Sequence, residues 1–450
     1  MADIENRSAL SRTTGHETAL ACLEAGIEAT RPDGLVAERL SLEGDELAID
    51  GLGTGRTTFD LARYDDVVLV GGGNAASQLA RALEALLGER ISGGAIVTDD
   101  PVETDRIDVF AGDHPVPSRR GVRNAERVLE LTRRATEDDL VIACLTGGGS
   151  ALLPAPVDAI SLSELQTTTD RLLASGAAID EINAVRKHCS LIKGGQLARS
   201  ASPATVVGLV VSDVVGDDPS VVASGPTVPD PTTYEDAIGV LERYDLDVPD
   251  AVRTHLRNGV DGSVPETPGP DDPLFDRVST HVIGNNRTAL DAAAETAAAR
   301  GYEPVVLSAR VRGEAREAAL THVAIAEECR TTGDPIAPPA VFLSGGETTV
   351  TLGEEYGSGG PNQEFVLSAA VELEDDGVVV AAVDTDGIDG ATDAAGAIAD
   401  ASSVDTDAGR AALASNDSTT ALSDADSIVR TGPTGTNVND LRVFVVDSNR

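Results

Sequence analysis

Short runs of valine, isoleucine and leucine recur along the chain and alternate with stretches whose apolar residues have helical spacing. Because these runs are continuous, they predict strands buried on both faces, as in a parallel sheet covered by helices. Before residue 260 we predict strands at 67–70, 95–98, 107–111, 140–145 and 205–211, with helices at 74–87, 119–134, 161–175 and 180–199. The pattern therefore indicates an α/β fold.

Residues 260–273 interrupt this pattern with four prolines and no apolar periodicity, which indicates a linker or surface crossover. The pattern then resumes, with strands predicted at 280–283, 304–307, 341–343, 348–352, 378–383 and 442–446 and helices at 287–300, 313–330 and 362–373. We therefore predict two α/β domains, at residues 1–262 and 274–450. Because ligands of such sheets bind outside the carboxyl ends of the strands, the loops there are the first candidates for a site.

Composition narrows the class of protein. The 450 residues include 34 Lys+Arg against 75 Asp+Glu, a formal net charge of −41. This charge excludes a sequence-independent nucleic-acid binder, because phosphate contacts need clustered cations. Only two of the basic residues are lysine. An acidic, lysine-poor chain suits a cytoplasm of molar salt, where charge repulsion is screened, so we expect a halophilic source.

The same sequence predicts a cytoplasmic protein with no membrane partner. No apolar run reaches the roughly 18–20 residues that span a bilayer, and the N-terminus lacks a basic-then-apolar signal pattern. The four cysteines lie far apart without a Cys-x-x-Cys spacing. They therefore predict buried thiols rather than a zinc site or a disulfide framework.

Glycine-rich loops follow several predicted strands. Residues 71–76 fit the dinucleotide pattern Gly-x-Gly-x-x-Ala, but equally another anion site or a tight turn. Residues 146–150, Thr-Gly-Gly-Gly-Ser, lack the nucleophile-elbow spacing and fit either a backbone nest for an anion or a turn with positive φ. Residues 344–348 and 357–364 are two more such loops. The chain has no Gly-x-x-x-x-Gly-Lys-[Ser/Thr] motif, so an ATP site would be of another type.

Charged residues add further candidates. The two lysines, Lys187 and Lys193, lie six residues apart and beside Arg186. A lysine is a compact point charge suited to one phosphate or carboxylate oxygen, although two surface lysines on one helix would give the same pattern. Acidic loops at 212–218 and 384–393 follow predicted strands. Their carboxylates suit Mg²⁺ or a general base, or are solvated surface charges.

Eight segments, in order, resemble the class II glycerate kinases, the glycerate 2-kinases whose C-terminal part is called the MOFRL domain. They are AGDHPVPSRRG, TGGGSALLPAP, EINAVRKHCSLIKGG, SDVVGDDPSVVASGPTVPDP, SGGETTV, GGPNQEFVLSAA, DTDGIDGATDAAGAIAD and TGPTGTNVNDL. The resemblance implies transfer of a γ-phosphoryl group from ATP, with Mg²⁺, to the 2-hydroxyl of D-glycerate. It also implies two α/β domains around a cleft that holds the active site. The N-terminal domain would be Rossmann-like with a parallel sheet, and the MOFRL segment would lie at about 335–446.

The resemblance assigns functional positions to Asp213, Arg186, Lys187 and Lys193, and we extend it with a hypothesis for the loops at the strand ends. We expect catalytic roles for Asp213, Lys187 and Lys193. The residues expected to bind substrate are Asn74, Gly148, Gly149, Ser150 and Arg186. Those expected to bind ATP are Gly345, Gly346, Glu347, Asn362 and Asp386, with Mg²⁺ at Asp217 and Asp386.

Two positions depart from the family pattern. Asn74 stands where members carry lysine, and Pro361 where members carry arginine before Asn-Gln-Glu. Two alternatives therefore stay open. One is an NAD(P)-dependent hydroxypyruvate reductase, a label once given to some members, which the loop at 71–76 would support. The other is a member that binds glycerate or nucleotide without turnover. The expected partners are D-glycerate and a nucleotide, and a homodimer is left open.

Overall fold

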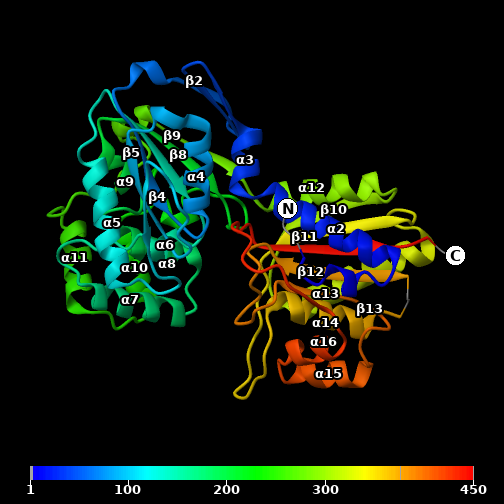
Figure 1. Ribbon diagram of the computed structural model, residues 1–450. Helices are drawn as coiled ribbons and strands as arrows, with labels where there is room; N and C mark the ends of the chain where they lie inside the picture. The colour runs from blue at the N-terminus through cyan, green and yellow to red at the C-terminus, as the bar shows by residue number, and fades with distance from the viewer. Residues whose placement is uncertain (1–3, 375–376, 449–450) are drawn as a thin grey trace. The chain divides into compact units, whose positions relative to one another are not determined.

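The computed structural model describes residues 4–374 and 377–448, and the chain forms two compact units (Figure 1). One is Leu35–Ile283, and the other combines Met1–Gly34 with Gly284–Arg450. The chain thus crosses between the units at 34–35 and at 283–284, which differs from the boundary predicted at 262–274. The first crossing arises because helix α2 (Thr14–Ala29) packs against helix α12 (Asn286–Ala299) and strand β15 (Asp440–Val446).

The main sheet of the unit 35–283 has six strands in the order β6-β5-β4-β7-β8-β9. These are β4 (Val67–Gly72), β5 (Gly93–Thr98), β6 (Asp108–Ala111), β7 (Leu140–Leu145), β8 (Thr205–Val211) and β9 (Val278–Gly284). The first five pair in parallel. This confirms the parallel sheet expected from the continuous apolar runs. β9, predicted to open the second domain, instead completes this sheet beside β8.

Counted from β4, the five parallel strands have the spatial order 3-2-1-4-5 of a Rossmann-type sheet. The order reverses between β4 and β7. Such a switch point leaves a crevice at the carboxyl ends of the two strands, and that is where doubly wound sheets bind ligands. The two loops that leave this point are residues 73–75 and 146–148.

Helices cover the sheet and build a second core beside it. In the sheet's own core, Val128 and Leu129 of α5 pack with Val97 and Val141. Helices α7, α8, α10 and α11 form the second core. The other elements between residues 32 and 260 are α3 (Pro32–Arg39), β1 (Leu40–Glu43), β2 (Glu46–Gly51), β3 (Gly55–Asp60), α4 (Ala76–Leu87), α5 (Arg119–Thr132), α6 (Gly149–Leu152), α7 (Leu162–Ala174), α8 (Ile179–His188), α9 (Gln196–Ala201), α10 (Tyr234–Arg243) and α11 (Asp250–Val260).

The single helix predicted at 180–199 is wrong: the structure has two helices, α8 and α9. Gly194 and Gly195 have φ of +59° and +75°, and two consecutive left-handed residues cannot continue an α-helix. Their amides donate to the carbonyls of Ser224 and Gly225, at 2.9 and 2.8 Å. The break places Lys193 on a loop rather than on a helix face.

The second unit has a six-stranded sheet in the order β10-β11-β15-β12-β13-β14, in which β10 and β11 pair in parallel and the remaining neighbours pair antiparallel. Helices α2 and α12 cover one face and α13 and α14 the other (Figure 1). Further elements are α1 (Arg7–Leu10), β10 (Glu303–Val311), α13 (Ala315–Thr332), β11 (Ala340–Gly346), α14 (Pro361–Glu372), β12 (Val378–Asp384), β13 (Gly396–Asp400), α15 (Thr406–Ala414), α16 (Ser418–Asp424) and β14 (Ile428–Val429).

The strand predicted at 348–352 is also wrong. Within this segment only Thr349 makes an isolated bridge, to Glu314. The backbone amide of Thr348 donates instead to the carboxylate of Asp440, at 3.2 Å. The Thr348 amide is therefore not available to pair with a neighbouring strand, because the Asp440 side chain accepts its hydrogen bond.

The four cysteines are buried and free, as predicted. Burial raises the pKa of Cys22, Cys144 and Cys189 to about 12, so these thiols stay protonated and unreactive. Within 4–374 and 377–448, no helix combines the length and the apolar character needed to cross a membrane.

Candidate active site

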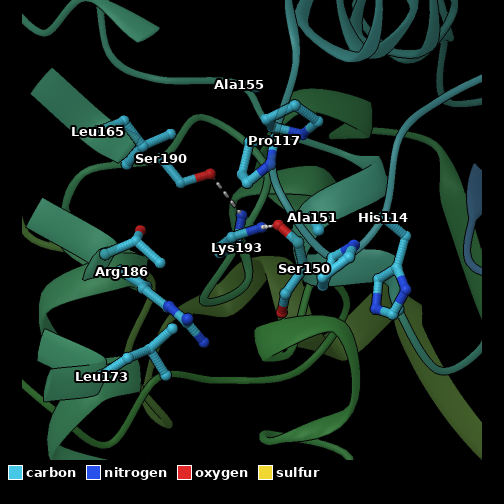
Figure 2. A pocket seen from close by; sticks show the side chains of 14 residues that line it. His114, Pro117, Ser150, Ala151, Ala155, Leu165, Leu173, Arg186, Ser190 and Lys193 are labelled. Carbon is cyan, nitrogen blue, oxygen red and sulfur yellow. Dashed lines mark hydrogen bonds between the residues drawn. The ribbon is translucent and has the colours of Figure 1, made fainter. Parts of the chain in front are cut away.

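A cavity of about 290 Å³ lies beside the switch-point loop of the unit 35–283 (Figure 2). Its walls combine apolar side chains with a few nitrogen-bearing and hydroxyl groups. The lining residues are His114, Pro115, Pro117, Gly148, Ser150, Ala151, Pro154, Ala155, Leu165, Thr169, Leu173, Arg186, Ser190 and Lys193. An apolar cavity with a small number of placed polar groups is typical of a small-molecule site.

The loop after β7 brings three predicted residues together. A Cβ atom on Gly147 would lie 2.1 Å from Oδ2 of Asp213, and one on Gly148 would lie 1.8 Å from Oδ1 of Asn74. Gly148 also has a φ of +74°, which L side chains rarely adopt. The turn is therefore restricted to glycine because the Asp213 and Asn74 side chains pack directly against it.

Lys193 contacts helix α6, which follows this loop. Its Nζ donates to the carbonyl oxygen of Ser150 at 2.8 Å, and the residue is 5 % exposed. Burial, with a further contribution from the positive charge of Arg186, lowers the pKa of Lys193 to about 7. The side chain is therefore poised to gain a proton when an anion approaches.

Arg186 lines the cavity from the last turn of α8. Within the described part of the chain, its guanidinium has no hydrogen-bond or ion-pair partner, and burial lowers its pKa. A desolvated guanidinium without a carboxylate partner stabilises a bound anion strongly. Arg186 and Lys193 thus bring two basic side chains to the same cavity.

Lys187 does not share this position. Its Nζ lies 3.3 Å from Oδ1 of Asp230, and both side chains are buried. Asp230 also accepts hydrogen bonds from Thr232 and Thr267. Lys187 therefore neutralises a buried carboxylate, and the cavity lining does not include it.

The amides of the glycine-rich loop after β4 donate to neighbouring segments of the protein. The amide of Gly73 donates to a carbonyl of β5 at 3.1 Å, and those of Asn74 and Ala75 donate to Gly147 O and Thr146 Oγ1, at 2.8 and 3.1 Å. A dinucleotide fingerprint presents such amides to a pyrophosphate. The loop therefore connects β4 to β5 and to the loop after β7 by hydrogen bonds, and it does not offer these amides to a dinucleotide.

The residues predicted to bind ATP lie in the second unit and meet around Asp440. In the β-ladder Asp440 stands opposite Gly346 of β11 and Asp384 of β12. Nδ2 of Asn362, in the first turn of α14, donates to Oδ1 of Asp440 at 2.6 Å. Gly345 is equally confined, because a Cβ there would lie 1.8 Å from a side-chain oxygen of α12.

Carboxylates dominate this cluster. Burial, with the nearby charges of Asp386 and Asp440, raises the pKa of Asp384 well above its ordinary range. Burial also raises the pKa of Asp389 to about 6, although this carboxylate accepts hydrogen bonds from the amides of α14. The fully buried Arg442 pairs with Asp440. A cation beside Asp384 would relieve the remaining repulsion.

The predicted metal ligands are not brought together within either unit, because Asp217 and Asp386 belong to different ones. No group of three or more His, Cys, Asp or Glu side chains among the described residues could hold a metal ion. Glu347 is exposed. A Mg²⁺ ion here would rely on one or two carboxylates and on phosphate oxygens, as is common for this ion.

Sequence reasoning missed several residues of the cavity and of the carboxylate cluster. His114 lines the cavity, and only its place in the AGDHPVPSRRG segment pointed to it. Asp440 and Arg442 organise the second cluster, and their Asn-Asp-Leu-Arg context resembles an ordinary strand start. Their importance depends on partners far away in sequence.

Comparison with known proteins shows which family the chain resembles. Residues 18–257 match a family described as a domain of unknown function (DUF4147), and residues 340–440 match the MOFRL family. The chain is 39 % identical over 446 residues to a glycerate 2-kinase from Pyrococcus horikoshii, covering 96 % of this chain and 98 % of that protein. It is 40 % identical over 402 residues to a D-glycerate 2-kinase from Thermotoga maritima, covering 87 % and 93 %.

Two further comparisons bear on the alternatives. A protein from Agrobacterium vitis named putative hydroxypyruvate reductase is 43 % identical over 388 residues, covering 84 % of this chain and 87 % of that protein. A solved structure of a glycerate kinase from Thermotoga maritima matches with a TM-score of 0.83 at 38 % identity, covering 96 % of this chain and 99 % of that one. The structural match and the sequence identity both extend over nearly the whole chain. This chain belongs to the glycerate kinase family.

Proposed function

We propose that this protein is a glycerate 2-kinase that transfers the γ-phosphoryl group of ATP to the 2-hydroxyl of D-glycerate. The observation that carries the proposal is the partnerless Arg186 beside the buried Lys193, in a cavity at the switch point. In a chain with a net charge of −41, two basic side chains in one cavity would attract and bind an anionic substrate.

In this proposal Arg186 and Lys193 hold the glycerate carboxylate. The hydroxyl would then lie toward the Gly147–Gly148 turn, against which the Asp213 carboxylate packs. Asp213 would accept the proton of the 2-hydroxyl while the new O–P bond forms and the bond to ADP breaks. Ser150 and Gly148 would fix the orientation of the substrate. Lys187 would stabilise the fold that carries Arg186.

Mg²⁺–ATP supplies the phosphoryl group and neutralises its charge when it is bound. The residues around Asp440 fit such a group, because Asp384 is held among like charges that a cation would relieve. Asp386 would take part in holding the metal, and Asn362 with the backbone of Gly345–Gly346 would contact phosphate oxygens. We further propose that the enzyme works in a salt-rich cytoplasm, which the density of surface carboxylates supports.

The test is an ADP-release assay in molar KCl with D-glycerate and ATP, with 2- and 3-phosphoglycerate resolved. Asp213→Asn should lower kcat at least about 100-fold, because the amide cannot accept the proton. Asp218→Asn, at an exposed position of the same loop, is the matched control and should keep activity within a few-fold. If Asp213→Asn has the same kcat as the wild type, Asp213 has no role in the mechanism.

The reductase alternative has its own test. Oxidation of a reduced nicotinamide by hydroxypyruvate, without ADP formation from glycerate, would establish it. The amides at 73–75 already donate to β5 and to the loop after β7. We therefore expect no such oxidation, because these amides are not available to a pyrophosphate.

A further inference from the structure

The loop that follows β6 carries a histidine into the cavity. Gly112 N donates to a carbonyl of β5 at 2.6 Å, and Nη2 of Arg120 donates to Gly112 O at 2.9 Å. Nε of Arg120 also pairs with Asp113 at 2.8 Å. At the other end of the loop, the side chain of Gln166 donates to Pro117 O at 2.6 Å. The backbone around His114 is therefore held at both ends.

The His114 ring itself is left to the cavity. The chain has 6 histidines, and the other five are buried and hydrogen-bonded to protein groups. Among the residues that the structure describes, only His114 has an exposed ring without a hydrogen-bond or ion-pair partner. His114 lines the same cavity as Arg186 and Lys193 (Figure 2). Such a placement suits a group that binds a ligand rather than one that stabilises the fold.

The position of the ring relative to Asp213 is specific. A Cβ on Gly148 would lie 3.2 Å from Cδ2 of His114, and one on Gly147 would lie 2.1 Å from Oδ2 of Asp213. The imidazole and the carboxylate therefore flank one two-residue turn. Arg186 lies on the opposite side of the Lys193–Ser150 hydrogen bond from His114 (Figure 2). A hydroxy acid held at Arg186 by its carboxylate would extend toward this turn, where His114 lines the cavity and Asp213 packs against Gly147 without being part of the lining.

We propose that His114 is a catalytic residue that donates a hydrogen bond to the phosphoryl group during transfer; this rests on the proposed kinase function. The hydroxyl oxygen of the substrate bonds to phosphorus, the bond from phosphorus to ADP breaks, and the hydroxyl proton passes to Asp213. His114 keeps its proton throughout. Phosphoryl-transfer enzymes stabilise the negative charge on the equatorial phosphoryl oxygens. The imidazole N–H of His114 would donate a hydrogen bond to one of these oxygens.

The test compares His114→Ala with Val116→Ala, a control in the same loop whose side chain is 54 % exposed. We expect His114→Ala to lower kcat by roughly 10-fold or more, with little change in KM for D-glycerate. Added imidazole should restore part of the lost kcat. Val116→Ala should behave as wild type and should not respond to imidazole. Both variants should unfold at the wild-type temperature, because neither side chain is buried.

The outcomes separate this proposal from the kinase function. If wild type phosphorylates glycerate and His114→Ala does so at the same kcat, or loses kcat without rescue by imidazole, the role of His114 is overturned and the kinase function stands. If wild type releases no ADP with glycerate, the kinase function fails and the role of His114 fails with it. A rescued loss of kcat supports both.

Discussion

Lys193 should take up a proton when the cavity binds an anion. Its pKa is lowered from 10.5 to about 7, first by burial and then by the positive charge of Arg186. At pH 8 only about a tenth of free molecules therefore carry a charged Lys193. A carboxylate bound beside both cations stabilises the charged form and returns the pKa toward its ordinary value. Binding of D-glycerate at pH 8 is then coupled to uptake of about 0.9 proton.

This proton uptake determines how steeply the affinity for D-glycerate falls as the pH rises. While the free enzyme holds Lys193 neutral and the complex holds it charged, each pH unit weakens binding by a factor approaching 10, or about 1.4 kcal/mol. The weakening begins near pH 7 and continues until the pKa of Lys193 in the complex is reached. Below about pH 6 the lysine is charged in both states, so affinity becomes independent of this group.

Calorimetric titration of D-glycerate in molar KCl measures the uptake directly. At pH 8, two buffers of different ionisation enthalpy should give binding heats that differ by about 0.9 of the difference between those enthalpies. At pH 6 the same pair of buffers should give almost equal heats. Lys193→Met should bind more weakly and lose the buffer dependence. Equal heats in the two buffers at pH 8 for wild type, or a buffer dependence that survives in Lys193→Met, would refute the reasoning.

Three further changes have defined outcomes. Lys187→Met should leave the buried Asp230 carboxylate unpaired and lower the free energy of unfolding by about 3–5 kcal/mol; denaturant titration measures this, and Asp230→Leu in addition should recover much of it. Gly148→Ala should lose most activity, because its Cβ would overlap the Asn74 side chain and its φ is left-handed, and Gly44→Ala, left-handed but with open space, should leave kcat intact. Arg442→Met should raise KM for ATP more than KM for glycerate, and equal changes in the two KM values would contradict our assignment of its surroundings to the nucleotide.

The strands were predictable because burial on both faces leaves a direct mark on the sequence. The apolar runs at 140–145 and 205–211 coincide with β7 and β8, and the glycine loop after β7 lies at the switch point. Helix α2 was not predictable as part of the second unit, since an apolar helix face does not specify which sheet it will cover. The same limit applies to the Asp440 cluster, which depends on contacts between segments far apart in sequence.

The two lysines illustrate the limit for the site. From the sequence they were equivalent cations six residues apart. The structure separates them. Lys187 forms an ion pair with the buried Asp230. The left-handed pair Gly194–Gly195 turns the chain after Lys193, and Lys193 donates to Ser150 instead. A charge count finds such a segment, but only its neighbours in space decide which cation meets a substrate.

The double crossing of the chain between its units has a consequence for biosynthesis. Residues 35–283 emerge from the ribosome as one continuous stretch and are able to fold at once. Helix α2, made earlier, must wait for strands that are translated much later. Its partner β15 is the last strand of the second sheet to be made, yet it lies between β11 and β12. The second unit therefore closes only after its final strand is released, and a nascent chain halted before residue 440 would expose the apolar face of α2 to chaperones.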